Sequence, residues 1–284
     1  MSAAAALSAR PRPPTPAAII HSLFVSLSDP SAIRLLPAPL LAFSQLRRLL
    51  PPDAATQLLL HPIASLLHLH RSDLRIGLQL HGLSLSAGLS CYSHLLPHLL
   101  SFYSHHPSLL PTASSLAAGS TSPEPYNVLI SACLNHGLPR HALAAYQKMV
   151  DKDAVPPDAF TYPKVLRACA ETGNLALGRA VHVRAVDAGM DRHLFFQNAL
   201  VSMYAKCWDL AAARTVFDGM EHRDVVSWNS MISGYAASGQ WRKAVELFLR
   251  MQAEGAEMNS VTWNTIAGGY IQMHDYRAAV GLIR

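Results

Sequence analysis

The amino-acid sequence predicts an all-α protein, an α-solenoid of stacked helix-turn-helix repeats. Residues 123–149 align with residues 225–251 at an offset of 102, and residues 58–92 align with residues 159–193 at an offset of 101. No segment alternates apolar and polar residues over the length of a strand, so each repeating unit is expected to be a helical hairpin. A hairpin of this size cannot bury its own apolar face, and it therefore needs stacked neighbours.

The first 57 residues differ in composition from the rest of the chain. They are poor in acidic residues and contain several Arg, Ser, Ala and Pro residues. This composition is typical of an organelle transit peptide, and we expect residues 1–57 to be poorly ordered. A plain disordered tail remains the alternative.

Repeats follow from residue 58 onward. Residues 58–122 are expected to hold two degenerate units, and the units after them are expected at residues 123–158, 159–193, 194–224, 225–259 and 260–284. The last unit ends within its second helix, so the chain is expected to be incomplete.

The unit over residues 225–259 shows the helical period most clearly. Its first half has apolar residues at the spacing of one helix face, namely Trp228, Met231, Ile232, Tyr235 and Ala236. Ser227 is the expected N-cap of this helix, and Gly239 is the expected residue of positive φ that ends it. A second stripe is expected to face the first, and it consists of Trp241, Ala244, Phe248 and Met251.

Composition limits the class of protein. Half of the 284 residues are apolar and 14% are charged, which argues against disorder over most of the chain. The net charge of +5 permits an anionic partner without requiring one. The four cysteines include no close pair, so free and buried thiols are expected instead of disulfides or a zinc site. No apolar run reaches the ~18 residues of a membrane span.

Several segments carry a family resemblance. Residues 125–137 read PYNVLISACLNHG, residues 159–189 read AFTYPKVLRACAETGNLALGRAVHVRAVDAG, and residues 195–224 read FFQNALVSMYAKCWDLAAARTVFDGMEHRD. With VVSWNSMISGYAASG at residues 225–239, they resemble pentatricopeptide repeat proteins of the plant PLS subclass. The Trp, Leu-Gly and Tyr pattern of tetratricopeptide repeats could not be placed.

The resemblance implies a right-handed superhelix of ordinary (P), long (L) and short (S) repeats. Residues 123–158 and 225–259 match the P type, residues 159–193 the L type and residues 194–224 the S type, while residues 58–122 match degenerate L and S types. The chain is expected to lack, or to be cut before, a C-terminal E- or DYW-type domain.

The resemblance also implies that each repeat faces one base of single-stranded RNA. The fifth and last residues of each repeat read the base, which gives Asn127, Asp158, Asn198, Asp224, Asn229, Asn259 and Asn264. The second residues sandwich the base, which gives Phe160, Phe195, Val226 and Val261, with Glu124 at the equivalent place in the first strong repeat. Lys206 is the residue expected to contact phosphate, and one such contact predicts weak binding by this segment alone.

The chemistry of Asn and Asp suits this role. An Asn amide offers both a donor and an acceptor, while an ionised Asp only accepts and fixes the orientation of the amide. An Asn in the first helical turn can instead simply satisfy free backbone N–H groups, which is the structural alternative. By the family's pairing rules, Asn127 with Asp158 and Asn198 with Asp224 favour U.

The remaining pairs differ. Asn229 with Asn259 favours a pyrimidine, C ahead of U, so the expected partner is pyrimidine-favouring single-stranded RNA. Pro163 with His193 matches no rule and leaves its base unassigned.

No catalytic motif is visible in the sequence. The HxE and CxxC pattern of zinc deaminases is absent, as are the GxxxxGK[ST] and GxSxG motifs, so an enzyme is not expected. Histidines are frequent between residues 61 and 106, but Pro97 would disturb a helix that carried His94 and His98 on one face, so neither a metal nor a cofactor is expected. His81 and His182 recur in register and are expected to be structural.

The expected function is sequence-selective RNA binding in organellar RNA modification or processing, such as specificity in C-to-U editing. The expected compartment is the mitochondrion, with the chloroplast as alternative, and other RNA-processing or editing factors are potential partners. Neither DNA nor a membrane is expected as a partner. Two alternatives stay open: a protein-binding scaffold of the tetratricopeptide type, and the specificity part of a longer cytidine deaminase.

Overall fold

The computed structural model of the protein describes residues 52–86 and 95–274. Every regular element in these two ranges is helical, which confirms the predicted all-α class. Contacts divide the chain into two compact units, Met1–Leu116 and Ala117–Arg284. Of the predicted transit-peptide-like segment, residues 1–51 lie outside the described residues, and residues 52–57 belong to the first described helix.

Unit 1 is a small helical assembly. It contains α3 (Pro52–Leu69), α4 (Leu74–Ser86), α5 (Leu96–Ser104), the 3₁₀ turn η3 (Pro107–Leu109) and all but the last residue of α6 (Leu110–Ala117). Helix α3 packs against both α4 and α5. The first helix of a hairpin thus contacts its own partner and the helix that follows, as stacked hairpins require.

Unit 2 repeats one hairpin along the chain. Its described helices are α7 (Glu124–Asn135), α8 (Pro139–Gln147) with the π-helical turn η4 (Lys148–Lys152), α9 (Thr161–Thr172), α10 (Leu175–Asp187), α11 (Leu194–Lys206), α12 (Leu210–Asp218), α13 (Val225–Ala237), α14 (Trp241–Ala253) and α15 (Ser260–Gln272). Each of the predicted segments at residues 123–158, 159–193, 194–224 and 225–259 contains one such pair of helices.

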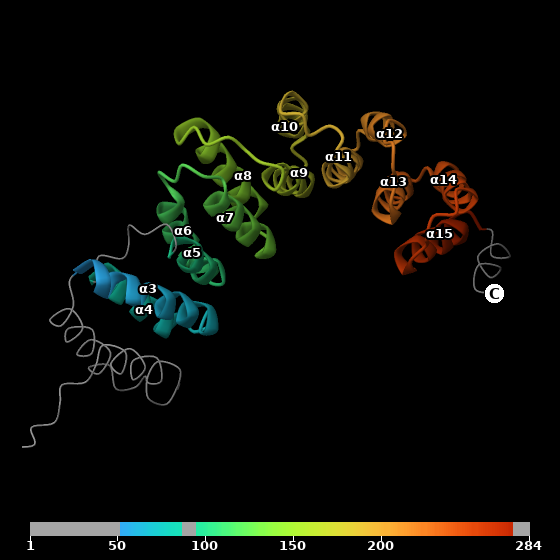
Figure 1. Ribbon diagram of the computed structural model, residues 1–284. Helices are drawn as coiled ribbons and strands as arrows, with labels where there is room; N and C mark the ends of the chain where they lie inside the picture. The colour runs from blue at the N-terminus through green and yellow to red at the C-terminus, as the bar shows by residue number, and fades with distance from the viewer. Residues whose placement is uncertain (1–51, 87–94, 275–284) are drawn as a thin grey trace, which may run out of the picture. The chain divides into compact units, whose positions relative to one another are not determined.

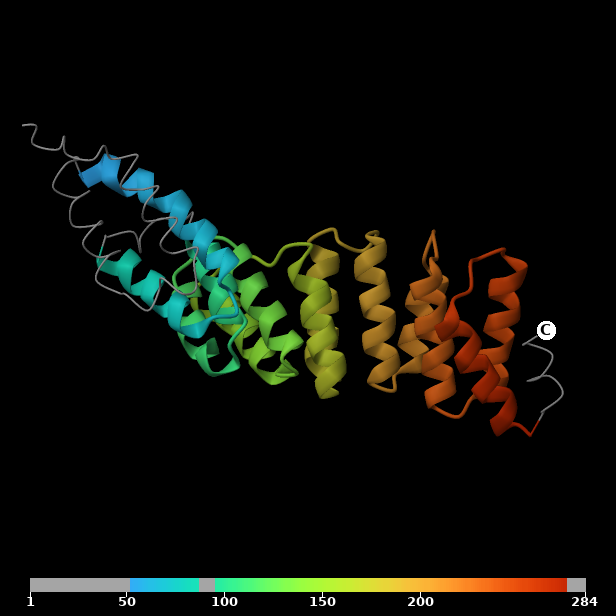
Figure 2. The same ribbon diagram turned by 90° about the horizontal axis from the view of Figure 1, so that it is seen from below.

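The helices of unit 2 form two layers. The first helix of each hairpin packs on the first helix of the next, and these helices line up as α7, α9, α11, α13 and α15 (Figures 1 and 2). We call this row the first-helix layer. The second helices form the other layer, and each contacts the first helices on both sides of it. Stacking of this kind buries the apolar stripes that a lone hairpin would expose.

The apolar stripes predicted for residues 225–259 are largely confirmed. On α13, the five predicted core residues are all buried, with Trp228 the largest at 1% exposure. On α14, Ala244, Phe248 and Met251 are buried, whereas Trp241 is only half-buried. Leu247, which was not included in the prediction, completes this core face.

The predicted N-cap of α13 is wrong by three residues. Asp224, not Ser227, is the N-cap, and its carboxylate accepts a hydrogen bond from the Ser227 backbone N–H. The Ser227 hydroxyl in turn accepts from the Asp224 backbone N–H, so the two residues form a reciprocal capping box. Both residue types are good caps, and the prediction chose the wrong one of the two.

The turns between first and second helices share one backbone conformation. Gly137, Gly173 and Gly239 have φ of 68°, 68° and 74°, as predicted for Gly239. Trp208 and His274 occupy the corresponding turns with φ of 66° and 59°. Only glycine adopts this left-handed region without steric cost, so the two side-chain-bearing residues are exceptions to the pattern.

A histidine–tyrosine hydrogen bond recurs in both units. His182 Nδ1 lies 2.9 Å from the hydroxyl of Tyr204, and His81 pairs with Tyr103 in the same way. In each case the two residues are 22 positions apart. Burial lowers the pKa of both histidines, so they stay neutral at pH 7. This arrangement supports the expectation that these histidines are structural.

The cysteines follow the predicted pattern in part. Cys133 and Cys169 are free and buried, and burial raises the pKa of both thiols, which keeps them protonated and unreactive at neutral pH. Cys207 is free but only half-buried, and Cys91 lies outside the described residues. Within residues 52–86 and 95–274, no helix combines the length and apolar character needed to cross a bilayer.

Candidate functional site

The carboxamide of Asn127, on α7, lies against the chain that leads into α9. Its Nδ2 atom donates hydrogen bonds to both carboxylate oxygens of Asp158, at 3.0 and 3.1 Å. Its Oδ1 atom accepts a hydrogen bond of 2.8 Å from the hydroxyl of Thr161. Asp158 also accepts from the backbone N–H groups of Phe160 and Thr161, at 2.9 and 2.7 Å. One polar cluster therefore joins an expected fifth-position reader to its expected last-position partner.

The same cluster recurs between α11 and α13. Asn198 Nδ2 donates to Asp224 Oδ1 at 3.0 Å, and the hydroxyl of Ser227 donates to Asn198 Oδ1 at 2.6 Å. The Ser227 backbone N–H donates to the same Asp224 oxygen at 2.9 Å. The capping box of α13 thus also holds the amide of the preceding repeat.

A third copy lies between α13 and α15, with Asn in place of Asp. Asn229 Nδ2 donates to Asn259 Oδ1 at 3.0 Å, and the Thr262 hydroxyl donates to Asn229 Oδ1 at 2.7 Å. Asn259 Oδ1 also accepts from the backbone N–H groups of Val261 and Thr262, at 3.1 and 3.2 Å. These backbone donors identify the atom that faces them as the oxygen of the Asn259 amide.

The three clusters determine which way each reader amide points. An ionised Asp has no proton to donate, so the nitrogen of Asn127 and of Asn198 must face it and the oxygen must face the hydroxyl. At Asn229 the oxygen of Asn259 imposes the same orientation. Asn198 and Asn229 each use one N–H in their cluster and have the other N–H left for another acceptor. Asn127 and Asn198 are buried and Asn229 is half-buried, so the amides are held in place by packing as well.

Sequence reasoning missed the hydroxyl residues Thr161, Ser227 and Thr262 as part of the site. All three are completely buried, and each comes three positions after the last residue of the preceding repeat. The recurrence of Ser or Thr three residues after Asp or Asn is a capping-box signal that could have identified them. Their contact with the amide of the neighbouring repeat becomes visible only in the folded chain.

The two aspartates are held in their charged form. Partial burial alone would raise the pKa of Asp158, but hydrogen bonds from Thr161, Asn127 and the backbone outweigh it and lower the pKa below its usual range. For Asp224, burial again raises the pKa, but hydrogen bonds from Ser227 and Asn198 outweigh this effect. The pKa of Asp224 is therefore also lowered. Both carboxylates are therefore ionised at neutral pH and act only as acceptors.

Exposed apolar residues flank the clusters. Phe160 and Phe195 are 72% and 79% exposed, and Val226 and Val261 are each 51% exposed. Phe160, Val226 and Val261 each follow the last residue of a repeat by two positions, so they stand beside the polar clusters at the start of a first helix. These side chains contribute little to the core, and their faces are accessible to a ligand.

The repeat at residues 159–193 lacks this cluster. Pro163 is buried in α9 and has no side-chain donor or acceptor. His193 is exposed, and as the N-cap of α11 it makes no side-chain capping hydrogen bond. Asn264 is exposed on α15, and the described residues do not include the position expected to pair with it. The three-residue cluster is thus present at three of the expected sites.

A cavity of about 550 Å³ lies beside the Asn229 cluster, between α11, α13 and α15. Several expected site residues line it, namely Lys206, Val226, Asn229, Asn259 and Val261. Trp208, at the turn after α11, lines the same cavity and was not singled out by sequence. An amide, a cation, apolar surface and an indole ring therefore face one space.

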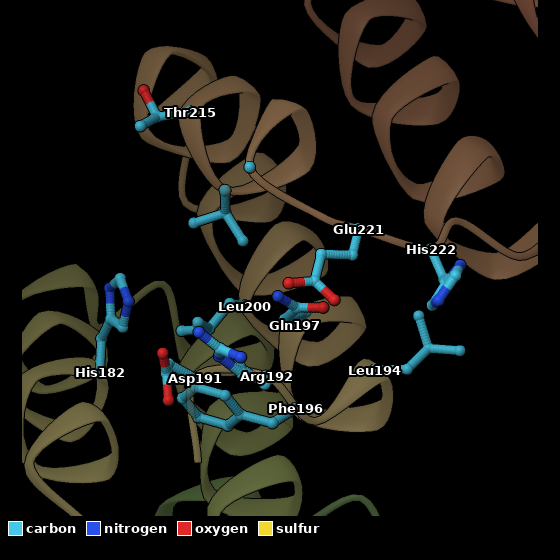
Figure 3. Close-up of a pocket in the computed structure, with 12 residues that line it drawn as sticks. His182, Asp191, Arg192, Leu194, Phe196, Gln197, Leu200, Thr215, Glu221 and His222 are labelled. Atoms are coloured by element: carbon cyan, nitrogen blue, oxygen red, sulfur yellow. The ribbon is translucent and has the colours of Figure 1, made fainter. Parts of the chain in front are cut away.

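A second cavity, of about 410 Å³, lies between α10, α11 and α12 (Figure 3). Polar and charged side chains line part of it, namely Asp191, Arg192, Gln197, Glu221 and His222. It contains none of the expected readers. In the described part of the chain, no group of three or more His, Cys, Asp or Glu side chains is arranged to hold a metal ion.

Comparison with known proteins places this arrangement in a family. The PPR repeat family model matches residues 125–171 and 223–272, and a PPR repeat model matches residues 198–225. A chloroplastic pentatricopeptide repeat-containing protein of Arabidopsis thaliana is 43% identical over 141 residues, which is 50% of this chain and 27% of that protein. A mitochondrial one from the same plant is 41% identical over 137 residues, 48% of this chain and 18% of that protein.

The chain belongs to the pentatricopeptide repeat family. It spans 27% and 18% of the lengths of these two relatives. Among solved structures, the pentatricopeptide repeat protein PPR10 from maize matches with a TM-score of 0.67 and 19% identity, over 95% of this chain and 38% of that one. PPR10 in complex with an 18-nucleotide psaJ RNA element matches with a TM-score of 0.66. These likenesses establish a pentatricopeptide repeat solenoid as the fold.

Proposed function

We propose that the chain binds single-stranded RNA in a sequence-selective way, with one base facing each repeat of the first-helix layer. The observation that carries this proposal is the recurrence of one polar cluster. In three repeats an Asn amide is held by an Asp or Asn at the end of its own repeat and by a hydroxyl of the next repeat.

An oriented amide discriminates between bases, whereas a freely rotating one does not. Its remaining N–H and its oxygen present a fixed donor and acceptor pattern, which matches one base edge and leaves a wrong base with unpaired polar groups. A peptide-binding scaffold would not need the same amide geometry in successive repeats. The recurrence therefore favours RNA over a peptide.

The exposed flanking residues supply the second part of the interface. Phe160, Phe195, Val226 and Val261 are positioned to sandwich a base from either side, and stacking on an aromatic ring contributes ~1–3 kcal/mol per base. Lys206 is exposed at the end of α11 and is proposed to contact phosphate. With one such cation, we propose modest affinity and a shallow dependence on salt.

The proposed base preferences follow from the pairs. Asn127 with Asp158 and Asn198 with Asp224 favour U, and Asn229 with Asn259 favours C ahead of U. Asn264 is proposed as a further reader, and the repeat with Pro163 and His193 is left without an assigned base. The preferred RNA is accordingly rich in pyrimidines.

We propose that this binding serves RNA modification or processing in an organelle, as a non-catalytic specificity factor. The names of the relatives support an organelle, the mitochondrion or alternatively the chloroplast, and the RNA complex of PPR10 supports an RNA ligand. The order of P, L and S repeats supports assignment to the PLS subclass. On that assignment, we propose that the chain acts as a specificity factor in C-to-U editing.

An exchange of one reader pair tests the proposal. By the family's pairing rules, Asn198→Thr combined with Asp224→Asn shifts the preference of that repeat from U to A. Asn259 caps α15 with the same geometry that Asp224 uses at α13, so Asn at position 224 preserves the cap. We expect the variant to gain about tenfold preference for A at a single position, because a tenfold change in affinity corresponds to about the free energy of one hydrogen bond.

The measurement is fluorescence anisotropy with labelled oligouridylates that carry one A at successive positions. The control is Asn174→Ser, because Asn174 caps α10 in the other helix layer and contacts no reader. An unchanged preference at every position would refute the base assignment. Equal binding of duplex and single-stranded RNA would refute selectivity for single strands, and no RNA binding at all would favour the protein-binding scaffold.

A further inference from the structure

Trp208 occupies a turn position where three neighbouring repeats have glycine. It follows the C-cap of α11 with φ of 66°, while the glycines at the equivalent turns have φ between 68° and 74°. An L-residue in this region brings its Cβ close to the following carbonyl oxygen, so Trp208 is strained where glycine is not. Strain of this kind is retained in proteins mainly where the residue has another role.

The turn geometry also directs any side chain away from the core. A Cβ built on Gly137, Gly173 or Gly239 would meet no atom within 4 Å, so this position faces open space. Trp208 is accordingly 67% exposed, whereas Trp228 on the adjacent first helix is 1% exposed. The indole therefore gives the fold little apolar burial in return for its strain.

The exposed indole lines the 550 Å³ cavity that also contains the Asn229–Asn259 pair. Lys206 lines the cavity from the end of α11, two residues before Trp208. The volume lies within the range of about 300–1,000 Å³ typical of small-ligand sites. An aromatic face, a cation and an oriented amide are the three features with which proteins hold a nucleotide of single-stranded RNA.

We propose that Trp208 is an additional stacking residue for the nucleotide that occupies this cavity. The inference rests on the proposed RNA binding, and it adds a contact outside the fifth, last and second positions of the repeats. The indole face would stack on the base of this nucleotide, and Lys206 would neutralise the phosphate next to it. The repeat of residues 194–224 thus contributes to binding through its turn as well as through its readers.

The replacement Trp208→Gly separates this role from a structural one. It restores the residue found at three of the equivalent turns, so the melting temperature should stay equal or rise. Affinity for a labelled oligouridylate should nevertheless fall about 5- to 150-fold, as expected for loss of one aromatic stacking contact. Trp208→Phe should keep most of the affinity, and Trp208→Leu should lose it as Trp208→Gly does.

An abasic nucleotide locates the contact. In a series of oligouridylates, each carries one abasic site at a different position. The wild-type chain and Trp208→Gly should bind with equal affinity only when the abasic site replaces the base that stacks on Trp208, because the stacking partner is then missing. Equal affinity of Trp208→Gly and the wild-type chain for intact oligouridylate would overturn the inference while leaving the proposed function in place. Failure of the wild-type chain to bind any of these RNAs would overturn both.

Discussion

The Ser227 hydroxyl takes part both in the capping box of α13 and in the cluster that holds the Asn198 amide. Its single proton is donated to Asn198 Oδ1 at 2.6 Å, with Asp224 Oδ1 at 3.0 Å as a second, longer acceptor contact, and its oxygen accepts from the Asp224 backbone N–H at 3.1 Å. The residue is completely buried, so water does not replace these bonds directly. Ser227→Ala removes the hydroxyl without adding any atom.

The cost has two overlapping parts. Loss of half a capping box costs ~1 kcal/mol, and a buried amide oxygen left without its donor costs ~1–3 kcal/mol. Because both parts involve the same hydroxyl, we expect the free energy of unfolding to fall by about 1–3 kcal/mol in total. Urea denaturation followed by circular dichroism measures it, and Ser227→Thr is the matched control because Thr262 makes the same bonds at α15.

The same variants have a functional consequence. Without the hydroxyl, the Asn198 amide keeps only Asp224 as a side-chain partner in its cluster and must be ordered further when a base binds. We expect affinity for oligouridylate to fall about 2- to 10-fold, the effect of immobilising one side chain. Equal stability of Ser227→Ala and the wild-type chain, or equal losses in Ser227→Ala and Ser227→Thr, would refute the reasoning.

Two further predictions concern the scaffold. In α4, Gly77→Ala should destabilise the protein by ~1–3 kcal/mol because the added Cβ overlaps the Phe102 ring. Gly82→Ala on the same helix meets nothing within 4 Å and should stabilise the protein by ~0.5–1 kcal/mol. Thermal denaturation that ranks the two variants alike would contradict this prediction. Burial lowers the pKa of His81 and His182, so the folded state binds fewer protons than the unfolded state and stability should fall below about pH 6.5. Urea denaturation from about pH 7 to about pH 5 should show a smaller fall in the double variant His81→Gln, His182→Gln, and an identical fall would contradict the assignment.

Much of the fold was readable from the sequence because its signals are local. Helical spacing of Trp228, Met231 and Ile232 on one face, and the turn glycine Gly239, are properties of a single hairpin. Repetition at a fixed offset then implied stacking, since no hairpin buries its own stripe. The expected partners Asn198 and Asp224 were also predicted from the sequence, through the resemblance to a family.

The remaining features depend on which residues the packing of neighbouring hairpins brings together. Sequence assigned Ser227 as the cap of α13, but the structure gives that place to Asp224 and uses Ser227 to hold the amide of the previous repeat. Ser227 and Asn198 are 29 positions apart in sequence, and only the contact between α11 and α13 brings them together. Trp208 reads as an ordinary turn residue until the folded chain places it on the cavity of Asn229. The sequence by itself therefore determined the helical repeat and its order, because those depend on local periodicity. Tertiary structure decided how each amide is oriented, because that depends on the distance between successive helices.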